Sequence, residues 1–139
     1  QWVVAGSPGY FEANGRPETP DDLASHKCLQ LLLGDNAAYR WELGRGDDEQ
    51  RLRVPGLITI NDTTTTIEAA KAGLGLAYLL QARIASELSQ GTLEIALEPY
   101  SSEGAPFHMY YSSRRHNHPA LRILINIIRA QNGLPRLAG

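Results

Sequence analysis

Four consecutive threonines, Thr63 to Thr66, follow an asparagine and an aspartate near the middle of the chain. Asn61 and Asp62 can accept hydrogen bonds from the first free N–H groups of a helix that starts here. Such a helix N-terminus also binds small polar or anionic ligands, and in open α/β sheets the ligands bind where strands end. The residues alone leave two interpretations equally open: a capped helix with spare hydroxyls, or a ligand-binding site.

The other reactive residues of the chain favour no catalytic or metal chemistry. Asp47, Asp48 and Glu49 lie in a predicted hairpin loop, where solvated carboxylates are the simpler interpretation. His116 and His118 have a spacing that could bind a metal, but no third ligand is close in sequence. The chain has no Gly-x-Ser-x-Gly elbow and no nucleotide-binding glycine loop. We therefore expect no enzyme, with no catalytic residue, no metal and no cofactor.

Cys28 is the one cysteine of the 139 residues, so an internal disulfide is excluded. It lies in an apolar run with no base nearby, which indicates a buried, inert thiol. A net charge of −2 gives no general electrostatic case for nucleic-acid binding. No apolar run reaches the roughly 20 residues of a membrane span, and no signal peptide is visible. The chain opens at Gln1 as if within a strand, which predicts a fragment of a longer protein.

Strands and helices alternate along the chain. Apolar or alternating patterns predict strands at 2–5, 28–33, 39–43, 50–54, 57–60, 74–80, 92–97 and 106–112. The strands at 28–33, 57–60 and 74–80 are expected to be buried. Capping residues and apolar periodicity predict helices at 8–13, 20–25, 63–72, 81–90 and 119–132. This alternation predicts an α/β fold with a mixed or largely parallel sheet, and the hairpin at 39–54 makes a purely parallel sheet unexpected.

Several motifs together resemble a known family. They are Val4-Ala5-Gly6-Ser7-Pro8-Gly9, Gly15-Arg16-Pro17, Thr19-Pro20-Asp21-Asp22-Leu23, Ala69-Ala70-Lys71-Ala72-Gly73-Leu74-Gly75-Leu76, Gly91-Thr92-Leu93 and Tyr110-Tyr111-Ser112-Ser113-Arg114-Arg115-His116. In this order they cover nearly the whole chain and resemble the second half of the effector-binding domain of LysR-type transcriptional regulators.

The resemblance implies a fold like that of type 2 periplasmic binding proteins, with two α/β subdomains joined by crossover strands. Residues 1–105 would form the second regulatory subdomain, with its mixed sheet. Residues 106–132 would be the C-terminal return strand and helix of an incomplete first subdomain, and 133–139 a frayed tail.

The resemblance also implies a cleft between the subdomains that binds a small, polar or anionic effector. The positions of this chain that match the cleft are Gly6, Ser7, Asn61, Asp62, Thr63 and Thr64. Effector binding would shift the population of closed subdomains and reposition the subunits of a homo-oligomer. The winged helix-turn-helix is absent from this chain, so DNA contact is expected only through a missing N-terminal domain. The expected location is the cytoplasm, with no membrane partner.

An alternative is a fragment of a periplasmic-type solute-binding protein for transport, which has the same fold. An upstream secretory signal would favour that alternative, and an upstream helix-turn-helix would exclude it. The 119–132 helix adds one physical expectation. Its apolar residues Leu121, Leu124, Ile125 and Ile128 need a partner, so we expect the chain to self-associate through this helix.

Overall fold

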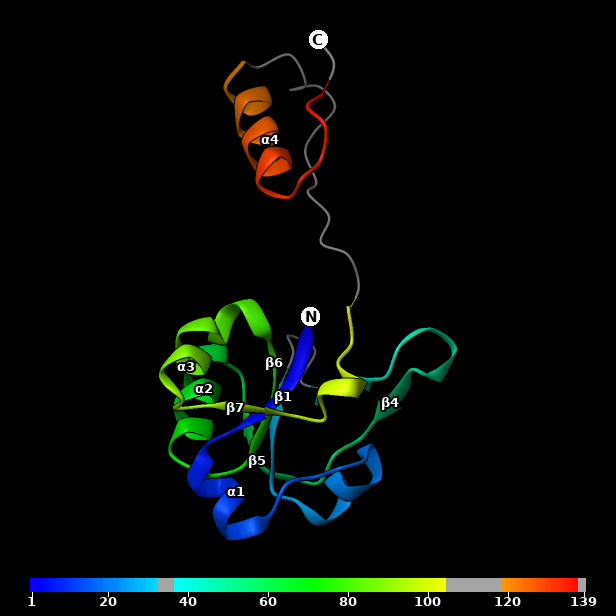
Figure 1. Cartoon of the computed structure of the whole chain (residues 1–139), viewed down its shortest axis with the longest axis vertical. Coiled ribbons are helices and arrows are strands. Elements are labelled where there is room, and N and C mark those ends of the chain that lie inside the picture. Colours follow the sequence, from blue (N-terminus) through cyan, green and yellow to red (C-terminus); the bar gives the residue numbers. More distant parts are fainter. Residues whose placement is uncertain (33–36, 105–118, 138–139) are drawn as a thin grey trace. The chain divides into compact units, whose positions relative to one another are not determined.

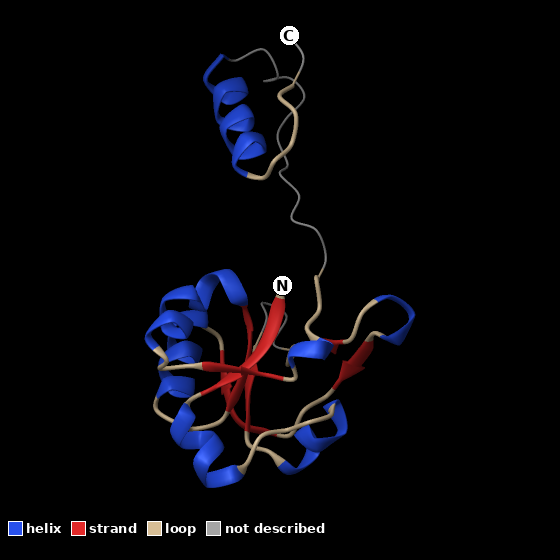
Figure 2. Cartoon of the chain, viewed as in Figure 1, coloured by secondary structure: helices blue, strands red, loops and turns tan. Residues whose placement is uncertain are grey.

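The computed structural model describes residues 1–32, 37–104 and 119–137. They belong to two compact units, Gln1–Ala105 and Pro106–Gly139 (Figure 1). The first unit is built on a sheet with helices around it, and the second holds one long helix (Figure 2). The predicted strand at 106–112 lies outside the described residues. No helix of the described part is long and apolar enough to cross a bilayer.

The central sheet has five strands in the order β5-β2-β6-β1-β7. These strands are β1 (Trp2–Gly6), β2 (Cys28–Leu31), β5 (Gly56–Ile60), β6 (Leu76–Leu80) and β7 (Glu94–Ala96). β2 runs parallel to β5 and β6, whereas β1 runs antiparallel to β6 and β7. A separate hairpin pairs β3 (Trp41–Leu43) with β4 (Gln50–Leu52). The mixed sheet confirms the predicted α/β class.

The helix ends of the first unit lie at the predicted capping residues, except for the start of α3. They are α1 (Pro8–Asn14), α2 (Thr63–Lys71) and α3 (Ala85–Gln90), with 3-10 turns at Pro20–Ser25, Gly46–Asp48, Gln81–Ile84 and Glu98–Tyr100. Thr19 and Asp22 form a capping box at the first 3-10 turn. The second unit contains α4 (Pro119–Gln131).

Both faces of the sheet are covered, because successive side chains of each strand point to opposite sides. Val3 and Ala5 pack with α2 and α3 on one face, where Ile67 and Ala70 of α2 are buried. Val4 faces the other way, into a core that α1 and the β3–β4 hairpin complete with Tyr10, Phe11, Leu23, Trp41 and Leu43.

Several sequence predictions are wrong in detail, and most predicted strands are a few residues shorter in the structure. β5 is the edge strand of the sheet, so the run expected to be buried leaves Leu57 58% and Ile58 38% exposed. An apolar run does not reveal whether a strand lies at the centre or the edge of a sheet. The helix expected at 81–90 begins as a 3-10 turn and becomes α-helical only from Ala85. The strand expected at 28–33 ends at Leu31.

The first and last residues of the first unit are tied together. The N–H of Trp2 donates to the Ser102 carbonyl over 2.7 Å, and the Ser102 N–H donates back to Trp2 over 3.1 Å. The Trp2 indole stacks on Tyr78 with 5.3 Å between ring centroids. The Ser102 hydroxyl accepts the Gly104 N–H over 3.0 Å. This bridge and stack fix the segment that leads out of the unit.

Ser101 and Ser102 form a matched pair for a stability test. Both are almost fully buried, but within the described residues the Ser101 hydroxyl has no hydrogen-bond partner. We expect Ser101→Ala to raise the free energy of unfolding by about 1 kcal/mol, because a buried hydroxyl without a partner is destabilising. Ser102→Ala removes the acceptor of the Gly104 N–H and should lower it by about the same amount. Urea unfolding measures both, and equal effects of the two substitutions would contradict this assignment.

Candidate functional site

Several exposed residues with unused hydrogen-bonding groups lie together at the start of α2, directly after β5. Asp62 is the N-cap of α2, and its Oδ2 accepts the Thr65 N–H over 2.7 Å and the Thr65 hydroxyl over 2.8 Å. The Thr66 hydroxyl donates to the Asp62 carbonyl over 2.9 Å. The bond from the Thr65 N–H lowers the pKa of the Asp62 carboxyl, and the Thr65 hydroxyl adds to this effect. Capping is therefore confirmed, and it uses Thr65 and Thr66.

Thr63 and Thr64 are left for other partners. Across the described residues, their hydroxyls make no hydrogen bond to the protein, and Thr63 is half-buried while Thr64 is exposed. Their backbone N–H groups are in the first turn of the helix, where no intrahelical acceptor exists. Asn61 is also exposed, just before the cap. The start of α2 thus presents hydrogen-bond donors at the positive end of the helix, which favours a polar or anionic ligand.

The register of the sheet places Gly6 at the opposite end of the strands from Asn61 to Thr64. The two edges of the sheet are here the two levels at which its strands begin and end. Gly6 is next to Leu76, since the pairing of β1 with β6 joins Ala5 to Ala77. β2 aligns Leu76 with Cys28, and the start of β5 aligns with Cys28 in turn. β5 then runs away from this level to its last residue, Ile60. At about 3.3 Å per residue and 4.8 Å per strand, Gly6 is roughly 13 Å along the strands and roughly 14 Å across them from Ile60.

The six predicted site residues therefore do not form one site. Asn61, Asp62, Thr63 and Thr64 are contiguous at one edge, and Gly6 and Ser7 lie at the opposite edge. The structure does not bring all six residues together, because β1 runs antiparallel to its neighbour β6.

Gly6 and Ser7 have structural roles in this arrangement. A Cβ at Gly6 would approach Leu76 Cδ2 to 2.8 Å. Ser7 is the N-cap of α1, and its hydroxyl accepts the Tyr10 N–H over 3.1 Å. A cavity of about 600 Å³ opens beside Ser7 at this edge. It is lined by the end of α2, at Lys71 to Gly73, and so lies at the far end of that helix from Asp62.

Three further residues lie at the same edge as Asp62, and the sequence patterns gave no signal for them. Trp2 pairs with Leu80 at the end of β6, and the Tyr39 N–H donates to Leu31 at the end of β2. Both rings are half-buried, 6.3 Å apart and stacked. Arg83 lies in the 3-10 turn that directly follows β6 at this end of the sheet, and its charge is the last of the causes that lower the pKa of Asp62. Strand pairing between distant segments brings them together.

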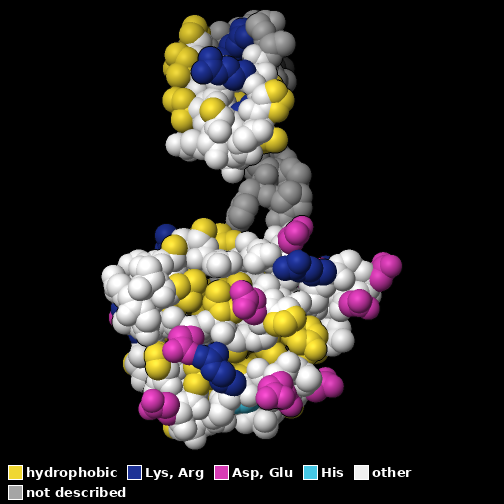
Figure 3. Space-filling model, in the orientation of Figure 1, with side chains coloured by type: hydrophobic (Ala, Val, Ile, Leu, Met, Phe, Trp, Pro, Cys, Tyr) yellow, Lys and Arg dark blue, Asp and Glu magenta, His cyan; other side chains and the backbone are white. Residues whose placement is uncertain are grey.

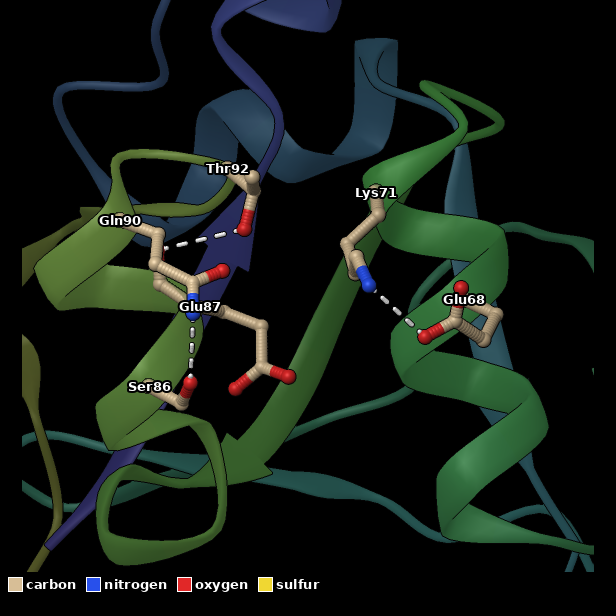
Figure 4. Close-up of polar contacts among 6 residues, drawn as sticks. All are labelled: Glu68, Lys71, Ser86, Glu87, Gln90 and Thr92. Carbon is tan, nitrogen blue, oxygen red and sulfur yellow. Dashed lines mark hydrogen bonds and ion pairs between the residues drawn. The ribbon is translucent and has the colours of Figure 1, made fainter.

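A second group of polar residues lies on α2, on α3 and just after α3, and its hydrogen bonds are local (Figure 4). Lys71 Nζ donates to Glu68 Oε1 over 2.9 Å, and Gln90 Nε2 donates to the Ser86 hydroxyl over 3.1 Å. The Thr92 hydroxyl donates to the Glu87 carbonyl over 3.3 Å. These bonds link each residue to neighbours in its own segment, so the cluster stabilises helix ends.

The remaining candidates show no reactive arrangement. Cys28 is fully buried, and burial raises the pKa of its thiol to about 12, which removes the thiolate at neutral pH. Among the described residues, no three His, Cys, Asp or Glu side chains are placed to hold a metal ion. His116 and His118 lie outside those residues. Asp47 and Asp48 are exposed in their 3-10 turn.

Comparison with known proteins identifies close relatives. A family model described as the LysR substrate binding domain matches residues 1–133. The chain is 32% identical over 126 residues to the HTH-type transcriptional regulator YcaN, and 32% over 125 residues to PgrR, both of Escherichia coli K12. These alignments cover 91% and 89% of this chain but only 41% and 42% of the relatives. The chain thus spans about two fifths of their length.

The fold of this chain is also similar to that of solved structures. The regulatory domain of CrgA, a LysR-type regulator from Neisseria meningitidis, matches with a TM-score of 0.78 and 20% identity, over 94% of this chain and 64% of that one. The regulatory domain of AphB from Vibrio vulnificus matches with a TM-score of 0.75 and 22% identity, over the same shares of the two chains. These matches confirm the predicted fold, which is like that of type 2 periplasmic binding proteins.

The cap of α2 makes stability depend on pH. The native pKa of Asp62 is lowered, so its ionised form stabilises the fold above the ordinary aspartate value of 3.8. This contribution is lost as the pH falls from that value through the native pKa. We expect Asp62→Asn to lower the midpoint temperature at pH 7 and to reduce the loss of stability on acidification.

Asp21→Asn is the control, because the Asp21 carboxylate makes no hydrogen bond within the described residues. Calorimetry of both variants from pH 7 to pH 3 makes the comparison. A pH profile that changes as much with Asp21→Asn as with Asp62→Asn would show that the cap is not its cause.

Proposed function

The chain belongs to the LysR substrate-binding domain family, and on this premise we propose that it is the ligand-sensing part of a bacterial LysR-type transcriptional regulator. In this role it binds a small molecule, and binding alters transcription through the rest of the protein. The relatives named as HTH-type transcriptional regulators support this role. Because the chain spans about two fifths of their length, DNA binding belongs to a part that this chain does not contain.

One observation carries the proposed ligand site. Thr63 and Thr64 keep their hydroxyls and first-turn N–H groups unused, while the neighbouring Thr65 and Thr66 hydroxyls are held by Asp62. A helix cap alone does not require two spare hydroxyls at its entrance. We therefore assign effector contact to Asn61, Thr63 and Thr64, with Asp62 holding the helix start in place.

The class of effector follows from the charges at this edge. Free N–H groups at the start of α2 and the nearby Arg83 favour a ligand with negative charge or several acceptor oxygens. The half-buried rings of Trp2 and Tyr39 add apolar surface at the same edge. A small carboxylate, with or without an aromatic body, fits this combination.

Effector binding would act by shifting populations. A ligand that contacts the start of α2 and the facing part of the longer protein favours the closed arrangement only if it binds that arrangement more tightly. The closed state would then reposition the subunits of a homo-oligomer and their DNA-binding domains, in the cytoplasm. The transport alternative has no observation in its favour, since the relatives compared here are named as transcriptional regulators.

The spare hydroxyls give a direct test in the full-length product of the gene. Thr63→Val and Thr64→Val keep the shape of each side chain but remove the hydroxyl. We expect each to weaken the response of a transcriptional reporter to its inducer by about tenfold, as expected for lost hydrogen bonds to a charged group. The midpoint temperature should change little, because neither hydroxyl is bonded within the described protein.

Thr92→Val is the control for position, because Thr92 lines the cavity at the opposite end of the sheet. Its hydroxyl donates to the Glu87 carbonyl, so only the response to inducer is compared. It should leave the response to inducer unchanged. An unaltered response in both Thr63→Val and Thr64→Val would exclude these hydroxyls from the site.

A further inference from the structure

A second cavity of the first unit lies where three 3-10 turns meet. It has a volume of about 390 Å³, and it is lined by residues of the turns Pro20–Ser25, Gly46–Asp48 and Glu98–Tyr100. Among the described residues, none that lines it belongs to α2. Its size is within the range of about 300 to 1,000 Å³ that is typical of small-molecule sites.

The walls of this cavity are tied together by hydrogen bonds. The Gly44 N–H donates to the Tyr100 carbonyl over 2.7 Å, and Arg45 Nε donates to the Ser101 carbonyl over 3.3 Å. A Cβ at Gly44, which has a φ of 102°, would approach the Asp48 carbonyl oxygen to 2.5 Å. The hairpin turn and the segment that leaves the unit are therefore held in one arrangement, and this arrangement requires glycine at position 44.

The backbone is strained directly before the third wall. Leu97 has a φ of 55°, and within the described residues it is the one non-glycine residue with a positive φ. Its left-handed conformation leads into the turn that contributes Pro99 and Tyr100 to the cavity. Strained backbone of this kind is concentrated at ligand sites, where it fixes a wall in place before the ligand binds.

Two side chains of opposite charge line the cavity without pairing. Arg45 and Asp48 are one turn apart, and the Asp48 N–H donates to the Arg45 carbonyl over 3.2 Å. In the described part of the chain, neither the terminal nitrogens of Arg45 nor the carboxylate of Asp48 has a hydrogen-bond or ion-pair partner. Apolar surface is added by Pro20, Leu43, Pro99 and Tyr100. The cavity thus offers one cation, one anion and an apolar wall.

The surrounding surface supplies no general attraction for anions. Residues 1–105 contain eight Lys and Arg against fifteen Asp and Glu, a formal charge of −7. On the face of the first unit drawn in Figure 3, acidic and basic side chains are interspersed among apolar ones, with no large basic patch. A carboxylate that binds in the cavity therefore needs the Arg45 guanidinium itself, and a ligand that also carries a positive charge suits the acidic unit.

We propose that this cavity is a second small-molecule site, which binds a zwitterion of the amino-acid type. The ligand carboxylate accepts hydrogen bonds from the terminal nitrogens of Arg45, and its ammonium group donates to the Asp48 carboxylate. Its apolar side chain lies against Pro99 and Tyr100. An exposed Arg–Asp pair contributes little to stability, so both charges remain free for the ligand. The site does not depend on the function proposed for the start of α2.

Isothermal titration calorimetry of the 139-residue chain with L-phenylalanine tests the site. We expect saturable binding with a dissociation constant below about 1 mM. Phenylpropanoate lacks the ammonium group and phenethylamine lacks the carboxylate, so each leaves one charge unpaired and should bind at least about tenfold more weakly. No binding of phenylalanine up to about 10 mM would overturn the proposal. Equal binding of phenylpropanoate would overturn it as well, because Asp48 would then not contact the ligand.

Two charge-removing variants locate the ligand. Arg45→Gln and Asp48→Asn should each weaken the binding of phenylalanine at least about tenfold, as expected for lost hydrogen bonds between charged groups. Arg45→Gln also removes the bond to the Ser101 carbonyl. Asp48→Asn is therefore the sharper test, since its carboxylate holds no other residue of the described chain. An unchanged dissociation constant in Asp48→Asn would overturn the proposal.

Three further variants are controls. Asp47→Asn and Arg53→Gln change exposed residues of the same segment that do not line the cavity, and each should leave the dissociation constant within about twofold. Losses as large as those of the cavity variants would show a general charge effect and overturn the site. Thr63→Val should also leave the binding of phenylalanine unchanged. If it removes binding while Asp48→Asn does not, phenylalanine occupies the start of α2 and the second site does not exist.

Discussion

The antiparallel pairing of β1 with β6 decides which residues of this chain can act together. β2, β5 and β6 all end at one edge of the sheet, whereas β1 begins there and ends at the other. Asn61 to Thr64 therefore share an edge with Trp2 and with the exit at Ser102, and Gly6 and Ser7 do not. The same register places the two ends of α2 in separate environments. Its first turn lies at the end of the sheet that carries Trp2 and Ser102, and its last turn lies at the opposite end, beside Ser7.

Local chemistry made much of the fold predictable. Ser7, Thr19, Asp62 and Gly91 are capping residues whose effect extends over one turn, and each helix end they predict is present. The resemblance to LysR-type regulators also predicted the fold correctly. Burial of β5 was not predictable, because its apolar residues are those of a central strand while its place at the edge depends on pairings with distant segments. The division of the site residues between two edges has the same cause.

The charge at the start of α2 differs from the net charge of the unit that carries it. The start of α2 offers donors and a nearby cation, in a unit with a formal charge of −7. An anionic effector would thus bind to a local positive field within an acidic surface, which favours specific contact over general attraction.

The central claim is that this chain senses a ligand through the first turn of α2. Amide chemical shifts of the chain, recorded by NMR during titration with benzoate and with benzyl alcohol as the uncharged counterpart, test it most directly. We expect benzoate to shift the amide resonances of Asn61 to Thr64 and of the Arg83 region, while those of Gly6 to Gly9 stay in place. Benzyl alcohol should shift neither group. Shifts centred on Gly6 to Gly9, with the start of α2 unchanged, would contradict it.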